Sequence, residues 1–429
     1  MRTTRLLGIA VLVLVLVGAA ALLMRESVLN WWLQNRLASH LAAQLGAGVR
    51  LEDVRYRSGM LLAARCRLDG PRPHVESADL RGIKTAVDWQ ELINPSGRQL
   101  QVEIDSAEIV RGSGEQSGRE NGARKWFGAG AKSPGLEIAV GRLTYRQEGQ
   151  AWPILKDVAM RATNGGGGWS FSARGGEVSV VGLPLLALDH LEGEYREGGL
   201  KIGSFAARDP KGGSLAGTAT NDRSHWSGQF LWQDLTVEQF VSSEIGTHFS
   251  GRSSGEARFD GEALRGKMTI AGAEARGLPS LVKMASIFAG EDWSNVPWSS
   301  FSFEFVRNAD ASMGFSNLLA QSPKGLAVKG AGRVGSDKID ATLSLGVSRK
   351  GHPWLVAFMP ILFRSESDGY LWTPVRVGGT TKAPTEDLTP RVVAALATVP
   401  ATEAVEAATE IPATAVESAA GLLRGLLRP

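Results

Sequence analysis

The stretch IDATLSLGV at residues 339–347 places an apolar residue at every second position, with Asp, Thr, Ser and Gly between them. Because successive side chains of a β-strand point to opposite faces, this period of two gathers the apolar residues on one face. The stretches FSFEF at residues 301–305 and LQVEID at residues 100–105 repeat the pattern. The sequence therefore predicts strands with one apolar and one polar face. The candidate residues for the apolar face are Phe301, Phe303, Phe305, Ile339, Leu343, Leu345, Leu100, Val102 and Ile104.

Glycine, at 52 of 429 residues, supplies turns between short β-rich runs. One strand per roughly 12 to 15 residues between positions 49 and 380 gives about 20 to 25 strands. Across Gly141 the apolar positions change phase, from Val140 to Leu143, which predicts a β-bulge. The predicted fold class is mainly β: an elongated, curved antiparallel sheet shaped as a groove, with an N-terminal transmembrane helix, a few short helices and C-terminal helices.

The apolar face of such a sheet must be shielded from water. Leaving 1,000 Å² of apolar surface wet costs on the order of 25 kcal/mol, more than the usual net stability of a domain. The predicted helices are too few to cover the sheet, so three solutions stay open: a closed barrel, stacked sandwiches, or a trough that holds another apolar substance.

The N-terminal segment predicts a membrane anchor. Residues 6–24 are uncharged and mostly apolar, and a helix of this length spans roughly 28 Å, close to the thickness of the hydrocarbon core. Arg2 and Arg5 precede it, which predicts a cytoplasmic N-terminus. A signal peptide cleaved near residues 19–21 is the alternative, and both predict export. The anchor positions singled out are Leu6, Val11, Val15, Leu22 and Met24.

Helical patterns flank the predicted sheet. Leu29, Leu33, Leu37, Leu41 and Leu45 recur every four residues before a Gly-Ala-Gly stop, which predicts an amphipathic helix. Trp31 and Trp32 in it are either an interfacial aromatic belt or core residues. Further helices are expected at 278–288, 388–399 and 414–427, and a loop at 111–135. The predicted parts are 1–25 (tip and anchor), 26–48 (amphipathic helix), 49–250 and 251–386 (two parts of the β-groove) and 387–429 (helical tail).

Composition argues against several functions. Lys plus Arg exceed Asp plus Glu by only three, so the net charge does not indicate a nucleic-acid-binding protein. Cys66 is the single cysteine, and the six histidines lie at least 23 positions apart, so neither residue type offers the ligand spacing of a metal site. We expect no G-x-S-x-G nucleophile elbow, no P-loop, no H-E-x-x-H and no G-x-G-x-x-G followed by a helix. We therefore expect no enzyme and no cofactor.

Sequence segments near both ends of the chain resemble one protein family. A basic tip, one span, an amphipathic helix ending in LGAGV and the strands RLEDVRYRSGMLLAARCRLDG (50–70) are similar to the opening of AsmA/TamB-like bacterial envelope proteins. The strings at 261–288, 326–345 and 372–391 resemble their C-terminal region, above all the strand Pro374–Thr380 with Pro384 after it. The middle of the chain is merely compatible with the family.

The resemblance implies a bridge-like lipid-transfer protein. Its implied location is the bacterial inner membrane, with the bulk in the periplasm and phospholipid as cargo moving toward the outer membrane. At ~4.8 Å per strand, 20 strands stack to about 95 Å, so an envelope protein partner or homo-oligomers are also expected. The alternative is a structural or assembly factor for outer-membrane protein biogenesis that carries no lipid.

Overall fold

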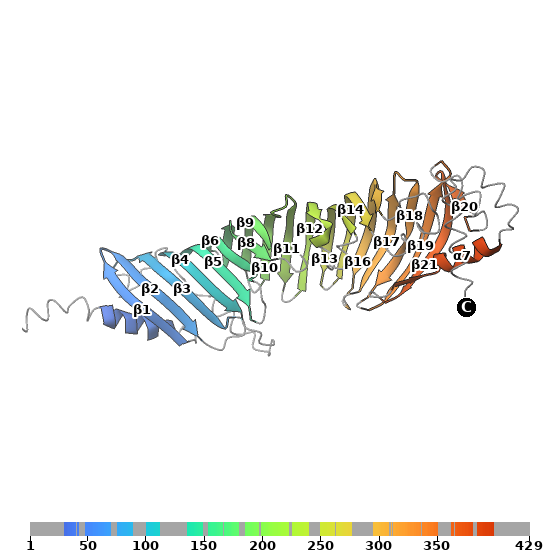
Figure 1. Ribbon diagram of the computed structural model, residues 1–429. Coiled ribbons are helices and arrows are strands. Elements are labelled where there is room, and N and C mark those ends of the chain that lie inside the picture. The colour runs from blue at the N-terminus through green and yellow to red at the C-terminus, as the bar shows by residue number, and fades with distance from the viewer. Residues whose placement is uncertain are drawn as a thin grey trace, which may run out of the picture. The chain divides into compact units, whose positions relative to one another are not determined.

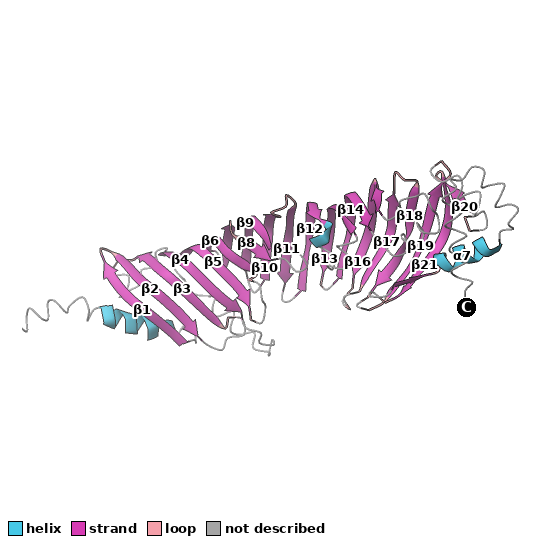
Figure 2. Ribbon diagram, viewed as in Figure 1, coloured by secondary structure: helices cyan, strands magenta, loops and turns pink. Residues whose placement is uncertain are grey.

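In the computed structural model, the described part of the chain is built mainly of β-strands (Figures 1 and 2). The described residues divide into two compact units, unit 1 up to Ala207 and unit 2 from Arg208. The predicted junction near residue 250 falls at the start of a strand of unit 2. The structure describes residues 30–39, 41–42, 48–69, 75–88, 100–111, 135–148, 153–165, 167–179, 185–196, 199–222, 225–239, 249–261, 263–276, 295–308, 310, 312–335, 337–350, 362–363, 365–380 and 384–398.

The sheet of unit 1 follows the order of the chain. Its strands are β1 (Gly48–Arg57), β2 (Met60–Asp69), β3 (Ser77–Ala86), β4 (Leu100–Arg111), β5 (Leu136–Gln147), β6 (Leu155–Gly165), β7 (Gly168–Arg174), β8 (Glu177–Ser179), β9 (Leu185–Arg196) and β10 (Gly199–Arg208). Each pairs with the next up to β6; the short strands β7 and β8 then both lie between β6 and β9, and β9 pairs with β10.

The sheet of unit 2 is likewise a meander. Its strands are β11 (Ser214–Asp222), β12 (His225–Thr236), β13 (Phe249–Asp260), β14 (Ala263–Arg276), β15 (Asn295–Trp298), β16 (Ser300–Arg307), β17 (Met313–Gln321), β18 (Leu326–Val334), β19 (Ile339–Ser348), β20 (Ser365–Ser367), β21 (Tyr370–Gly379) and β22 (Pro384–Glu386). Neighbours pair in antiparallel fashion, β15 and β16 both beside β14, and β21 pairs with β19, β20 and β22. A 3₁₀ turn, η1 (Val237–Gln239), follows β12.

The expectation of a purely antiparallel sheet is wrong at one place. β4 and β5 pair in parallel, with Leu100 beside Leu136 and Arg111 beside Gln147. Parallel neighbours need a connection long enough to return to the starting edge, usually a dozen residues or more. The chain between Arg111 and Leu136 has that length, so the long segment predicted as a loop at 111–135 allows the crossover that a hairpin turn forbids.

The bulge predicted at Gly141 belongs to a row that crosses five strands of unit 1. In β5 the register against β6 shifts between Val140 and Leu143, as expected. Neighbouring strands change phase at the same height, where Asp53 and Gly82 have positive φ angles of 53° and 64°. Because all five strands change together, their apolar residues stay on one face while each strand bends. The residues of the row are Asp53, Ala64, Gly82, Asp105 and Gly141.

The N-terminal helix (residues 30–39 and 41–42) packs on the first strands of unit 1, as its four-residue repeat predicts (Figure 1). Leu33 is buried with Leu51 and Cys66, and Leu37 and Leu41 pack against the same cluster. Burial raises the pKa of the Cys66 thiol to about 11. That shift keeps the thiol protonated and unreactive at neutral pH.

The two tryptophans of this helix are exposed, Trp31 at 65% and Trp32 at 41%. A core role, which was one of the two readings, is therefore wrong for both of them in this structure. Arg36 lies 5.1 Å from the centre of the Trp32 ring, a cation–π contact at the surface.

At the other end, α7 (Leu388–Thr398) confirms the helix expected from residue 388. The Glu386 carboxylate accepts hydrogen bonds from the backbone N–H groups of Leu388 and Thr389, which caps the helix. Within the part of the chain that the structure describes, no helix has the length and apolarity that crossing a bilayer requires. The predicted span 6–24, the helices 278–288 and 414–427 and most of the loop 111–135 lie outside the described residues.

Candidate functional site: the apolar sheet faces

The strand register of unit 2 places the predicted apolar residues of β16 and β19 on one face. Phe305 of β16 lies opposite Phe315 of β17, which lies opposite Gly332 of β18, and Gly332 in turn lies opposite Ala341 of β19. Alternation along each strand then adds the remaining candidates to the same face. They are Phe301 and Phe303 of β16 and Ile339, Leu343 and Leu345 of β19.

In unit 1 the remaining three candidates also share a face. Leu100, Val102 and Ile104 of β4 lie beside Leu136, Ile138 and Val140 of β5. This face continues across the unit to β1, where the N-terminal helix covers it. Each unit therefore has its own one-sided apolar sheet.

The candidate residues differ in depth. Phe305, Leu345 and Ile104 are buried, each with no more than 8% of its surface exposed. The other six, including Phe301 and Phe303, are half-buried. Packing within the sheet accounts for the buried three, whereas the half-buried side chains leave part of their apolar surface open to a further contact.

One part of the apolar face in unit 2 is covered by the chain itself. Leu388 and Val392 of α7 belong to the same buried cluster as Leu345, Leu371 and Val375. The helix thus closes the face over β19 and β21. The aromatic residues of β13 and β16 that pack against this cluster are half-buried.

Aromatic rings form a chain of contacts on this face, from the half-buried Phe249 to the buried Trp232. Phe249 lies 5.1 Å from Phe301, Phe301 lies 6.2 Å from Phe303, Phe303 lies 6.3 Å from Phe305, and Phe305 lies 6.4 Å from Trp232, measured between ring centres. Tilted and edge-on ring pairs at these distances are mutually attractive. The rings come from β12, β13 and β16, so the contacts tie these strands together.

Several rings lie directly over glycines of the neighbouring strand, a feature that the sequence analysis did not identify. A Cβ placed on Gly266 would stand 2.6 Å from the Phe305 ring, so only glycine leaves room for this ring against the sheet. The signal was present in the sequence as isolated glycines inside alternating strands. The pairs are Phe171 with Gly193, Phe230 with Gly217, Phe259 with Gly228, Trp232 with Gly255, Phe305 with Gly266, Phe315 with Gly332, and Trp372 with Gly346.

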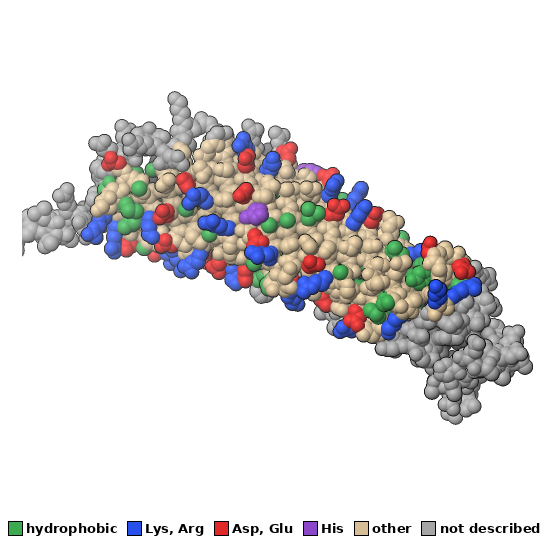
Figure 3. Space-filling model, turned by 90° about the horizontal axis from the view of Figure 1, so that it is seen from above, with side chains coloured by type: hydrophobic (Ala, Val, Ile, Leu, Met, Phe, Trp, Pro, Cys, Tyr) green, Lys and Arg blue, Asp and Glu red, His purple; other side chains and the backbone are tan. Residues whose placement is uncertain are grey.

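The opposite face of each sheet is polar, and its charges are mixed in sign. Figure 3 shows one side of the molecule, where Lys and Arg are interspersed with Asp and Glu. In unit 2 a shallow depression of about 590 Å³ on the polar face has Glu256, Arg258, Lys267 and Glu304 among its lining. Lys267 and Glu304 form an ion pair at 3.4 Å, so their charges are largely balanced within the sheet.

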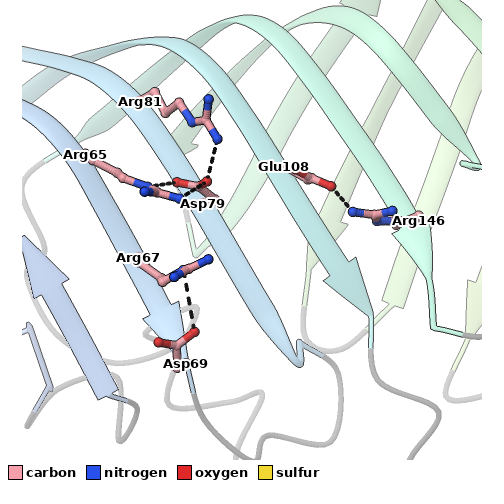
Figure 4. A network of polar contacts seen from close by, with 7 residues as sticks. All are labelled: Arg65, Arg67, Asp69, Asp79, Arg81, Glu108 and Arg146. Carbon is pink, nitrogen blue, oxygen red and sulfur yellow. Dashed lines mark hydrogen bonds and ion pairs between the residues drawn. The ribbon is translucent and has the colours of Figure 1, made fainter.

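A polar network links the strands of unit 1 on this face (Figure 4). Asp79 of β3 accepts two hydrogen bonds from Arg65 of β2, both of 2.8 Å, and one of 3.0 Å from Arg81. Glu108 of β4 pairs with Arg146 of β5. The Arg65 hydrogen bond, followed by the contacts with Arg81, lowers the pKa of Asp79 to about 2. The arrangement stabilises the sheet and presents no cluster of acids to a substrate.

Replacing Asp79 with asparagine is expected to lower the free energy of unfolding by about 1 kcal/mol near neutral pH. A carboxyl group with a depressed pKa stabilises the fold above its unfolded value of 3.8 and loses that contribution as the pH falls toward about 2. The variant and the wild type should therefore converge near pH 2. Urea titrations followed by circular dichroism measure this, with Asp69→Asn as the control, since Asp69 is half exposed and lies 4.0 Å from Arg67. An equal difference at every pH would contradict the assignment.

One sequence spacing suggests a nucleophile, and the structure does not support that role. Residues 251–255, GRSSG, have the G-x-S-x-G spacing, so the expectation that this pattern is absent from the sequence is wrong. In hydrolases that serine stands exposed on a sharp turn between a strand and a helix. Here Ser253 lies inside β13, is fully buried and donates a 2.9 Å hydrogen bond to the carbonyl of Leu235. Ser253 holds two strands together.

Comparison with known proteins adds no assignment to these observations. No family model matches the chain, and no curated protein matches it, so its fold and its apolar faces are the grounds on which a function can be proposed.

Proposed function

We propose that this protein binds phospholipid on its apolar sheet faces and passes it along the bacterial envelope, anchored in the inner membrane with its bulk in the periplasm. The observation that carries the proposal is the half-buried, aromatic-lined face of unit 2. Fully burying a side chain such as Phe303 is favourable by roughly 1.5–3 kcal/mol relative to leaving it in water. Several such residues side by side make acyl chains a favourable partner.

Two features of the sequence support this assignment. The predicted span at residues 6–24 and the basic residues before it favour attachment to a membrane, where acyl chains are the most abundant apolar material. The strings at both ends of the chain resemble AsmA/TamB-like envelope proteins, for which lipid movement along a sheet is the implied role.

In this mechanism the protein needs no reaction centre. Acyl tails lie against the apolar side chains while the head group stays in water, and movement is diffusion along the face. Direction comes from outside the chain, through an envelope protein partner or through copies of the same chain. We therefore propose a carrier without catalytic activity, without a cofactor and without nucleic acid as a partner.

Purification of the full chain in a mild detergent tests the proposal. We expect phospholipid to co-purify with the protein and to be detected by mass spectrometry at a stoichiometry well above that of an unrelated single-span protein treated identically. Equal lipid content in the two preparations would count against lipid carriage. That result would favour the alternative, a structural or assembly factor for outer-membrane protein biogenesis.

A further inference from the structure

The apolar face of unit 2 carries one basic side chain among the strand residues that the structure describes. By register Arg307, the last residue of β16, lies opposite Leu264 of β14 and Met313 of β17, on the face that holds Phe305. The other Lys and Arg residues on the described strands of this unit fall on the polar face. A cation on this face is unexpected, because placing a charged group in apolar surroundings costs free energy unless a partner of opposite charge offsets that cost.

Arg307 has no such partner within the described part of the chain. Its side chain is exposed, and no ion pair or hydrogen bond joins it to another described residue. Arg333 on the polar face near the same sheet edge differs, because its guanidinium binds Asp310 at 2.6 Å and Ser312 at 2.7 Å. The guanidinium of Arg307 is therefore available to an anion from outside the chain.

Large apolar side chains are exposed at the same edge of the sheet, which is the side where β16 ends and β12 and β17 begin. Met313, directly opposite Arg307, is 42% exposed, and Trp226 at the start of β12 is 41% exposed on the same face. An edge that combines an unpaired cation with exposed apolar groups is complementary to a molecule that joins an anion to a hydrocarbon.

The length of β16 fits such a molecule. At ~3.3 Å per residue, the six steps from Arg307 back to Phe301 cover about 20 Å. One acyl tail occupies about 15 Å, half of the ~30 Å hydrocarbon core of a bilayer. A tail that begins beside Arg307 and runs along the strand therefore passes Phe305 and Phe303 and ends before Phe301.

Resting on the lipid-carrier function proposed above, we propose that Arg307 binds the phosphate of an anionic phospholipid at the edge of the sheet. The tails of that lipid lie along β16, across the row of phenylalanines. The head group stays at the wet edge, where a guanidinium donates two hydrogen bonds to phosphate oxygens. Arg307 thus fixes which end of the lipid faces water and favours phosphate over uncharged head groups.

The test compares two tail-labelled probes, phosphatidylglycerol and diacylglycerol with the same fluorescent tail, bound to the full chain in nonionic detergent. We expect Arg307→Gln to weaken binding of phosphatidylglycerol about fivefold, the effect of one exposed ion pair, and to leave diacylglycerol unchanged. Arg307→Lys should recover most of the loss. Arg265→Gln is the matched control, because Arg265 lies on the adjacent strand β14, opposite Val306, on the polar face.

Three results would overturn the proposal. Equal losses of affinity for both probes would mean that Arg307 supports the apolar site and does not recognise the phosphate group. An equal loss in Arg265→Gln would show a general effect of charge, and displacement of the lipid by a millimolar excess of inorganic phosphate would show a site for the free anion. Failure of the wild-type protein to bind either probe would instead contradict the proposed carrier function itself, and the proposed role of Arg307 with it.

Discussion

Replacing Phe303 with aspartate is expected to abolish lipid binding and transfer while leaving the strands in place. The ring of Phe303 lies between those of Phe301 and Phe305, at 6.2 and 6.3 Å, and is half-buried on the apolar face of unit 2. A carboxylate there would have to lose its water when an acyl tail lies over it, at a cost of several kcal/mol. The bound state is therefore disfavoured far more than the empty one.

The measurement is the amount of phospholipid that co-purifies with the variant, together with its far-ultraviolet circular dichroism. Leu231→Asp is the matched control, because Leu231 lies on β12 of the same unit, is 56% exposed and points to the polar face. We expect this control to bind lipid as the wild type does. A folded Phe303→Asp protein that retains its full lipid content would exclude this face as the binding surface.

Gly266→Ala is expected to destabilise unit 2 by about 1–3 kcal/mol, a large effect for one methyl group. The new Cβ would overlap the carbonyl oxygen of Glu256 and would stand 2.6 Å from the ring of Phe305. Neither the backbone of the neighbouring strand nor the packed ring can yield without disturbing its own contacts. The ring should therefore leave its place against the sheet, and lipid content should fall with it.

Urea titration of the full chain gives the change in stability, and Gly314→Ala provides the comparison. Gly314 lies on β17, where an added Cβ would be 3.8 Å from the nearest atom, the carbonyl oxygen of Val306. Alanine there is expected to change stability by less than about 0.5 kcal/mol, and any change should be favourable because alanine restricts the unfolded chain. Similar behaviour of the two variants would mean that the glycine beneath Phe305 is not needed for ring packing.

The sequence alone determined the strands and their faces. Alternation in FSFEF and in IDATLSLGV depends only on the twofold period of a strand, so Phe303 and Leu343 could be assigned to an apolar face without coordinates. The four-residue repeat of leucines predicted the N-terminal helix for the same reason, because local geometry decides which positions share a side. The bulge at Gly141 was visible as a change of phase within one segment.

Tertiary structure decided everything that depends on which strands become neighbours. Alternation cannot show that β4 and β5 run in parallel, or that the bulge at Gly141 continues as a row through four other strands. Nor does it reveal that Gly266 lies under Phe305, or that Met313 stands opposite Arg307, because a side of one strand acquires neighbours only through the register of the sheet. The period of a strand is fixed locally by the backbone, whereas register is set by pairings between distant residues.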